Sequence, residues 1–148
     1  MANKHLMTPM QKHKTEITIP RKIVQKLLHH AQLTPDQEVC GLVSSRDNIP
    51  FHSYPIKNVS LSPETLFSLD AQEQIQVMAQ MRDNDEQLFA IYHSHPTAPA
   101  IPSNTDLEQA SYPEALYLII SLSIKGILEI RGYFIEDAQF VEISLSLT

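Results

Sequence analysis

The chain has 148 residues, of which 43% are hydrophobic and 19% are charged. This length suits one domain with a buried core, and the composition is that of a folded soluble protein rather than a disordered one. Residues 1–30 carry a net charge of +5, whereas residues 31–148 carry −11. An acidic body repels nucleic acid, so we expect no nucleic-acid partner and interpret the basic segment as a solvated tail and first helix.

The single cysteine, Cys40, excludes an intrachain disulfide framework and fits a reducing compartment. The N-terminus lacks the apolar stretch of a secretory signal, and the longest apolar run, Ala115 to Ile120, is too short to span a bilayer. We therefore expect a cytoplasmic protein with no membrane partner. The chain has no internal repeat or Gly/Ser linker, so we expect a flexible lead-in at residues 1–14 and one domain at residues 15–148.

The first predicted elements are a strand at residues 16–19 and a helix that begins after Pro20. The helix continues to about Gln32, because apolar side chains recur on one face at helical spacing. The segments 39–45 and 51–56 are typical of strands, and the stretch "RDNIP" between them predicts a turn.

A second helix is predicted within residues 69–86, with Asp70 as its N-cap. Its apolar face is expected to contain Ile75, Met78 and Ala79, which follow the helical spacing.

The second half of the chain is predicted to be mostly strands. The segment 88–95 is a strand that Pro96 ends, and a short helix is expected from about residue 104 to 111. Three further strands are expected at residues 116–122, 126–136 and 140–147. This order of elements predicts an α/β (α+β) domain in which helices pack on a largely antiparallel sheet.

Two histidines stand one residue apart at the end of the 88–95 strand, in "YHSHP". Because residues i and i+2 of a strand point to the same face, His93 and His95 would present their imidazoles side by side. Two ring nitrogens could then reach one zinc ion at about 2.0–2.1 Å. The pair alone is also compatible with two packed or solvent-facing histidines.

A third metal ligand is available in Asp106, after the loop "PTAPAIP", whose prolines restrict the chain. A catalytic zinc site takes three protein ligands and keeps one position for water. Residues Ser103 to Asp106 also match a capping box, so they could simply begin a helix. The two interpretations are compatible, since a helix start holds both side chains in a fixed relation.

Glu38 stands at the entrance to the 39–45 strand, which we expect beside the 88–95 strand. A glutamate at a strand end is most often a solvated charge. Together, however, these residues resemble the JAMM (MPN-plus) family of zinc-dependent isopeptidases and peptidases. Its pattern is an upstream glutamate, H-[ST]-H, seven residues, serine, two residues and aspartate. Glu38, "HSH" at 93–95, Ser103 and Asp106 supply every element. The resemblance covers about residues 16–145 and is strongest to the short prokaryotic members.

The resemblance implies an MPN fold, with a mixed curved sheet and flanking helices in a cytidine-deaminase-like arrangement. It implies that His93, His95 and Asp106 hold one Zn²⁺ per chain. It also implies that Glu38 is the general base and that the Ser103 hydroxyl stabilises the oxyanion. The implied reaction is hydrolysis of a peptide bond after the C-terminal Gly-Gly of a ubiquitin-like or sulfur-carrier protein.

The sequence leaves two other functions open. The same zinc chemistry could act on small peptides of the cell-wall type, or the chain could be a catalytically silent MPN scaffold that binds partner proteins. A silent scaffold would be expected to lack a ligand or the glutamate, and this chain has all five residues. A nucleoside deaminase fits poorly, because its zinc site needs a P-C-x-x-C motif that one cysteine cannot supply.

Overall fold

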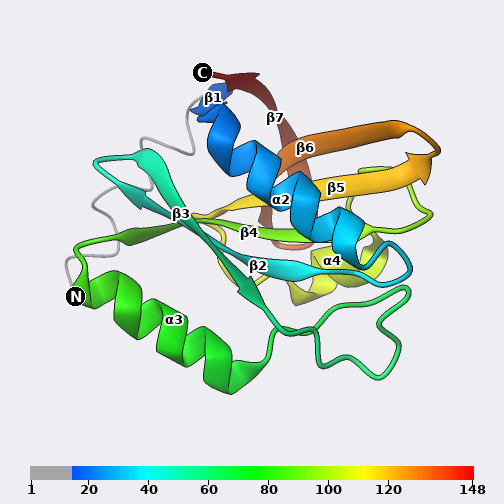
Figure 1. The fold of residues 1–148 in the computed structure, drawn as a ribbon, viewed down its shortest axis with the longest axis horizontal. Helices are drawn as coiled ribbons and strands as arrows, with labels where there is room; N and C mark the ends of the chain where they lie inside the picture. The colour runs from blue at the N-terminus through cyan, green and yellow to red at the C-terminus, as the bar shows by residue number, and fades with distance from the viewer. Residues whose placement is uncertain (1–14) are drawn as a thin grey trace.

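A computed structural model describes residues 15–148, so the lead-in expected at residues 1–14 lies outside the described part. The described residues form one seven-stranded sheet and three helices (Figure 1). The helices are α2 (Arg21–Leu33), α3 (Ala71–Asp83) and α4 (Asn104–Gln109). The strands are β1 (Glu16–Ile19), β2 (Cys40–Arg46), β3 (Ile49–Ile56), β4 (Gln87–His95), β5 (Leu116–Ile124), β6 (Ile127–Glu136) and β7 (Gln139–Leu147). None of these helices has the length and apolarity that crossing a membrane requires.

The strand order in the sheet is β1-β7-β6-β5-β4-β2-β3. The pairs β1·β7 and β4·β5 are parallel, and the other four described pairs are antiparallel. The largely antiparallel sheet expected from the sequence is therefore confirmed. Strand β2 pairs with β4, with Cys40 opposite His93, so the predicted neighbourhood of these two strands is also confirmed.

The helices cover both faces of the sheet (Figure 1). Successive side chains of a strand point to opposite faces, and β4 contributes to a separate core on each side. Ala90 and Tyr92 pack in the core that contains the buried face of α2. Ile91 packs in the other core, together with Met81 of α3. His93 lies two residues beyond Ile91, so the histidine pair belongs to the face that α3 and α4 cover.

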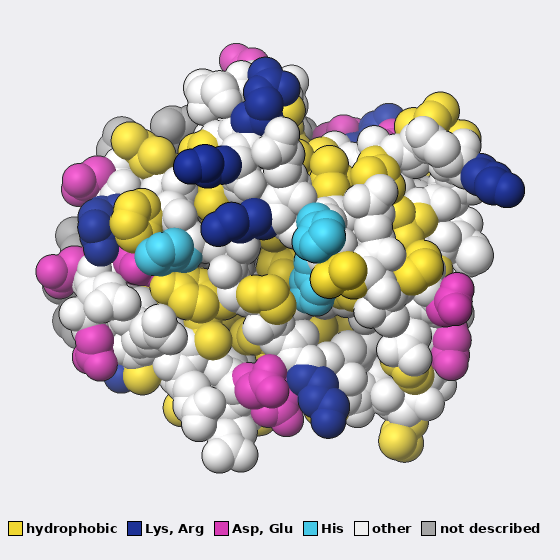
Figure 2. Space-filling view, viewed as in Figure 1, with side chains coloured by type: hydrophobic (Ala, Val, Ile, Leu, Met, Phe, Trp, Pro, Cys, Tyr) yellow, Lys and Arg dark blue, Asp and Glu magenta, His cyan; other side chains and the backbone are white. Residues whose placement is uncertain are grey.

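Helix α2 forms as its sequence pattern predicts. Its buried residues are Ile23, Val24, Leu27 and Ala31. Lys and Arg side chains gather over α2 on its solvent side (Figure 2), and the predicted solvated basic face is confirmed for this helix. His30 has a structural role, because its Nδ1 lies 2.7 Å from the hydroxyl oxygen of the buried Tyr92. This contact joins α2 to β4.

Three local predictions were wrong, namely the burial of Ile75, the start of β3 and the end of the second helix at Glu86. Ile75 was expected on the buried face of α3, but it is 69% exposed, and Met81 is the buried residue of this helix. The turn between β2 and β3 contains only Asp47 and Asn48, both with positive φ, so β3 begins at Ile49 rather than at residue 51. A two-residue turn of this kind suits the right-handed twist of a hairpin.

Glu86 was expected at the end of the second helix, but it follows α3 and is buried. Its carboxylate accepts a hydrogen bond from the Tyr54 hydroxyl at 2.7 Å, and it lies 3.2 Å from His52 Nδ1. Burial alone would raise the pKa of Glu86, but the polar side chains around it, with Tyr54 and His52 at hydrogen-bond distance, outweigh burial and lower it. The resulting buried carboxylate ties β3 to the start of β4, the strand that carries both histidines.

Gly41 lies where β2 passes between β3 and β4. A Cβ atom at Gly41 would collide with the backbone carbonyl oxygen of Tyr54 and would lie 2.6 Å from Cε2 of the Tyr92 ring. At Gly132 the nearest atom would be Cδ2 of Leu145, at 3.0 Å, which is the end of a flexible side chain. The backbone of β3 therefore lies so close to Gly41 that no other residue fits at this position, whereas the contact at Gly132 can be relieved.

We expect Gly41→Ala to lower the free energy of unfolding by about 3 kcal/mol, at the upper end of overpacking costs, and Gly132→Ala to lower it by about 1 kcal/mol or less. Urea unfolding followed by circular dichroism measures both values. Equal losses in the two variants would show that the close approach at Gly41 does not constrain the sheet.

Candidate metal centre and active site

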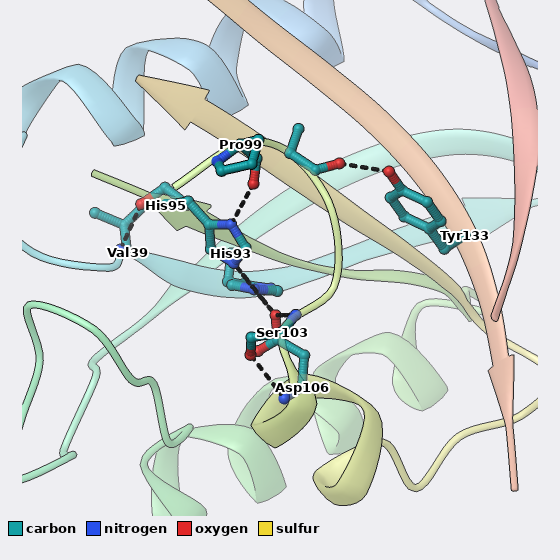
Figure 3. Close-up of polar contacts among 9 residues, drawn as sticks. Val39, His93, His95, Pro99, Ser103, Asp106 and Tyr133 are labelled. Atoms are coloured by element: carbon teal, nitrogen blue, oxygen red, sulfur yellow. Dashed lines mark hydrogen bonds and ion pairs between the residues drawn. The ribbon is translucent and has the colours of Figure 1, made fainter. Parts of the chain in front are cut away.

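The candidate site lies at the C-terminal end of β4. His93 and His95 point from this strand toward Asp106 in the first turn of α4 (Figure 3). The two Nε2 atoms lie 3.1 Å apart, and they lie 3.1 Å and 3.2 Å from Oδ2 of Asp106. The three residues predicted as ligands therefore meet at one point, and both histidines are buried.

These short contacts leave the site in need of a positive charge. His95 donates its Nδ1 proton to the carbonyl oxygen of Pro99 at 2.7 Å. The Nε2 atom of a neutral His95 then carries a lone pair that faces the lone pairs of the Asp106 carboxylate. Two acceptors at 3.2 Å repel each other. A proton on His95 or a metal ion bound by the three atoms removes this conflict.

The pKa values of the three residues reflect both their burial and the short contacts between them. Burial would lower the pKa of His95, but hydrogen bonds to Asp106 and Pro99 outweigh burial and raise it. Burial would likewise raise the pKa of Asp106, but hydrogen bonds from His93 and His95 hold it well below its usual range. His93 is more deeply buried, and desolvation lowers its pKa. The carboxylate therefore stays ionised and attracts positive charge.

Ser103 and Asp106 form the predicted capping box at the start of α4. The Ser103 hydroxyl oxygen accepts a hydrogen bond from the Asp106 N–H at 3.0 Å, and Oδ2 of Asp106 accepts one from the Ser103 N–H at 2.9 Å. This Oδ2 atom is the one that faces both histidines. The Asp106 side chain is therefore both a member of the capping box and a candidate metal ligand, and the two interpretations of the sequence are compatible.

The loop between β4 and α4 is held in place by hydrogen bonds that its backbone carbonyl groups accept from side chains. Figure 3 shows the bond from His95 to Pro99 and the bond that the buried Tyr133 hydroxyl donates to the carbonyl group of Ala100. The Ser121 hydroxyl also donates to the carbonyl oxygen of Ala98, at 2.7 Å. Strands β5 and β6 thus fix the loop that leads to Asp106. The prolines indicated a restricted loop, but nothing in the local sequence indicates these partners, because they lie 23 and 33 residues away.

Glu38 comes just before β2 and is 5% exposed. A carboxylate oxygen of Glu38 and one ring nitrogen each of His93 and His95 all lie within 4.8 Å of one another. Its Oε1 atom has no hydrogen-bond partner among the described residues. Burial raises the pKa of Glu38 to about 7. The simple interpretation as a solvated charge is wrong, and this carboxyl group can exchange a proton near neutral pH.

A cavity of about 300 Å³ opens beside His93 and Asp106. Its wall includes Phe67, whose ring stacks on His93 with 4.3 Å between ring centroids and 21° between planes. Phe67 lies in the loop between β3 and α3, far from the motif in sequence, and sequence reasoning missed it. No local pattern around Phe67 distinguishes it from an ordinary loop residue.

Comparison with known proteins decides the family. Residues 20–131 match the family described as prokaryotic homologs of the JAB domain. The chain belongs to this family. The resemblance to JAMM proteins inferred from the motif, and the MPN fold that it implied, are confirmed.

The relatives of this JAB-family chain include named peptidases. The CysO-cysteine peptidase of Mycobacterium tuberculosis (strain H37Rv) is 34% identical over 128 residues, which cover 85% of this chain and 87% of the relative. The probable TtuB-protein conjugate cleaving protease of Thermus thermophilus is 27% identical and covers 88% of this chain and 84% of its own length. A solution structure of a protein from Desulfitobacterium hafniense superposes with a TM-score of 0.80 at 32% identity, covering 89% of this chain and 92% of that one.

We expect Asp106→Ala to lose zinc. The removal of a direct ligand should lower zinc affinity by more than the roughly 10- to 100-fold that follows loss of a group hydrogen-bonded to a ligand. Ser103→Ala is the matched control, because it breaks the other half of the capping box but keeps the three ligand atoms and the Ser103 N–H. Zinc per chain, measured by plasma emission after dialysis, should stay near one in Ser103→Ala. Equal losses in both variants would assign Asp106 to helix capping alone.

Proposed function

We propose that this chain is a zinc-dependent peptidase that hydrolyses the bond after the C-terminal Gly-Gly of a ubiquitin-like or sulfur-carrier protein. The observation that carries the proposal is the meeting of His93, His95 and Asp106 at one buried point, with the Glu38 carboxyl group beside them. The substrate class is supported by the names of the relatives, which include a CysO-cysteine peptidase, a TtuB-conjugate protease and a desampylase from Haloferax volcanii.

The donor set fits zinc. Two imidazole nitrogens and one carboxylate oxygen form a common ligand set of catalytic zinc, with the fourth position left for water. Ligand atoms of a tetrahedral zinc ion with bonds of about 2.0–2.1 Å are about 3.3–3.4 Å apart. The three distances here, 3.1 Å, 3.1 Å and 3.2 Å, are close to that spacing. His93, His95 and Asp106 would hold one ion per chain.

A zinc ion held by these three atoms would supply Lewis acidity for the scissile carbonyl group and would lower the pKa of water at its open position toward about 7. Glu38 accepts the proton of the attacking water and later delivers it to the nitrogen of the leaving amine. Both steps need a carboxyl group whose pKa is close to the working pH, and burial raises the pKa of Glu38 to about 7.

We assign the Ser103 hydroxyl the role of an oxyanion donor. Its oxygen accepts the Asp106 N–H, and its own proton goes to none of the described residues, so it can donate to the oxyanion that forms on the scissile carbonyl group. Cys40 is no rival nucleophile. It is fully buried, it donates to the Ile56 carbonyl group, and burial raises the pKa of its thiol to about 12.

The presence of all five motif residues around one point favours an enzyme over the silent scaffold that the sequence left open. A cytoplasmic location remains a prediction that rests on the single cysteine, Cys40.

The decisive assay uses a Gly-Gly sulfur-carrier protein with a short C-terminal extension, incubated with zinc-loaded enzyme. We expect intact-mass analysis to show loss of the residues after Gly-Gly. Glu38→Gln should keep zinc and lower the rate by roughly 10² or more, because it removes the proton carrier. A carrier with Ala-Ala in place of Gly-Gly is the substrate control.

Equal turnover by wild type and Glu38→Gln would place the base elsewhere. Cleavage of free small peptides but not of the carrier would overturn the substrate class and favour the cell-wall alternative.

We expect Ser103→Ala to lower kcat by roughly 10²- to 10³-fold, in the range of losing one oxyanion donor, while zinc stays bound. Ser103→Thr, which keeps the hydroxyl group and the cap, is the matched control and should retain most of kcat. The same intact-mass assay, run as a time course, measures both rates. A kcat in Ser103→Ala equal to that of wild type would leave Ser103 with the helix cap alone.

A further inference from the structure

The backbone of Glu38 lies just outside the sheet. Strand β2 begins at Cys40, and Val39 is already tied to β4, since its carbonyl oxygen accepts the Ser94 N–H at 3.0 Å. Glu38 itself is held from another direction. Its N–H donates to the carbonyl oxygen of Pro63 at 2.7 Å, and its carbonyl oxygen accepts from the side-chain amide of Asn58 at 2.9 Å. Both partners belong to the loop at residues 57–70, between β3 and α3 (Figure 1).

Asn58 uses its whole side chain in this arrangement. Its Nδ2 donates to the carbonyl oxygens of Glu38 at 2.9 Å and of Leu66 at 3.0 Å. Its Oδ1 accepts from the N–H groups of Ser60 and Ser68, each at 3.0 Å. A side-chain amide has two donor protons and two acceptor sites, so all of them are occupied. One side chain therefore joins both limbs of the loop to Glu38.

The same loop reaches the candidate metal centre from its other limb. Phe67 follows Leu66, whose carbonyl oxygen Asn58 binds, and the Phe67 ring stacks on His93. The neck of the loop is closed by a bridge between Asn58 and Leu69. The loop is thus attached at Glu38 and packed against His93, and Asn58 sits between the two attachments.

We propose that Asn58 is a positioning residue for Glu38. This inference rests on the proposed function, because it assigns Asn58 the task of fixing the general base relative to the reacting atoms. The Glu38 side chain approaches the histidines from a backbone segment without strand pairing of its own. Loss of the Asn58 amide frees the Glu38 carbonyl group and opens the loop that binds the Glu38 N–H. Misplacement of a catalytic group by about 1 Å can cost about 10²-fold in rate.

The test compares Asn58→Ala and Asn58→Asp with Ser60→Ala. Asn58→Asp has the same shape and keeps the acceptor for Ser60 and Ser68, but it lacks the donor for the carbonyl oxygens of Glu38 and Leu66, so it removes the bond to Glu38 while the acceptor half of the side chain stays. Ser60→Ala removes a bond inside the loop, in which the Ser60 hydroxyl oxygen accepts the Ser62 N–H at 3.1 Å, and leaves Glu38 untouched. Amide hydrogen exchange by NMR, zinc per chain, and kcat and KM on the carrier substrate are measured for each variant.

We expect both Asn58 variants to exchange the Glu38 amide proton faster than wild type, and kcat to fall about 10- to 100-fold with KM within about twofold and zinc near one per chain. Ser60→Ala should match wild type in all four readouts.

The proposal would be overturned if the Glu38 amide proton in both Asn58 variants exchanged at the wild-type rate, or if their kcat were unchanged. It would also be overturned if Ser60→Ala lost as much kcat as the Asn58 variants. An inactive wild type would reject the proposed function, while the exchange rates would still report whether Asn58 holds Glu38.

Discussion

The site depends on the meeting of two imidazole nitrogens and one carboxylate oxygen within 3.1–3.2 Å of one another in a buried place. Such a group of donor atoms is unfavourable without a positive charge, so the surrounding structure must hold the atoms together. Three parts of the structure hold these atoms in place. Strand β4 fixes the two histidines on one face, carbonyl bonds from His95, Ser121 and Tyr133 fix the loop, and the first turn of α4 fixes Asp106.

The fold and the site are joined most closely at Asp106. Its Oδ2 atom accepts the N–H of Ser103 and faces both histidines. A capping interaction normally satisfies the free N–H groups of a helix start, and here it also fixes the direction of the oxygen that we propose as a metal ligand. A short helix of six residues suffices, because its role is to orient two side chains and not to supply a large packed face.

The sequence predicted the parts of this protein that depend on local spacing. The HxH pair on one strand face and the capping box follow from periodicity and a short motif, and both are confirmed. The pairing of β2 with β4 joins distant segments; it was expected only from the compactness of one sheet, and it is also confirmed. Prediction from the sequence failed where the outcome depends on distant segments. Ile75 follows the helical spacing but faces solvent, because the position of α3 on the sheet turns Met81 inward instead. Glu86, Tyr133 and Asn58 have their roles only through partners more than ten residues away, at Tyr54, Ala100 and Glu38.

The three proposed metal ligands and the proposed general base are held by different parts of the chain. The β4 strand, the loop after it and α4 hold His93, His95 and Asp106, whereas the loop at residues 57–70 holds the backbone of Glu38. The same loop packs Phe67 on His93 at the wall of the cavity, so a substrate chain that enters this cavity would contact the element that holds the backbone of Glu38. In a chain of 148 residues, this one loop therefore joins the wall of the cavity to the proposed proton carrier.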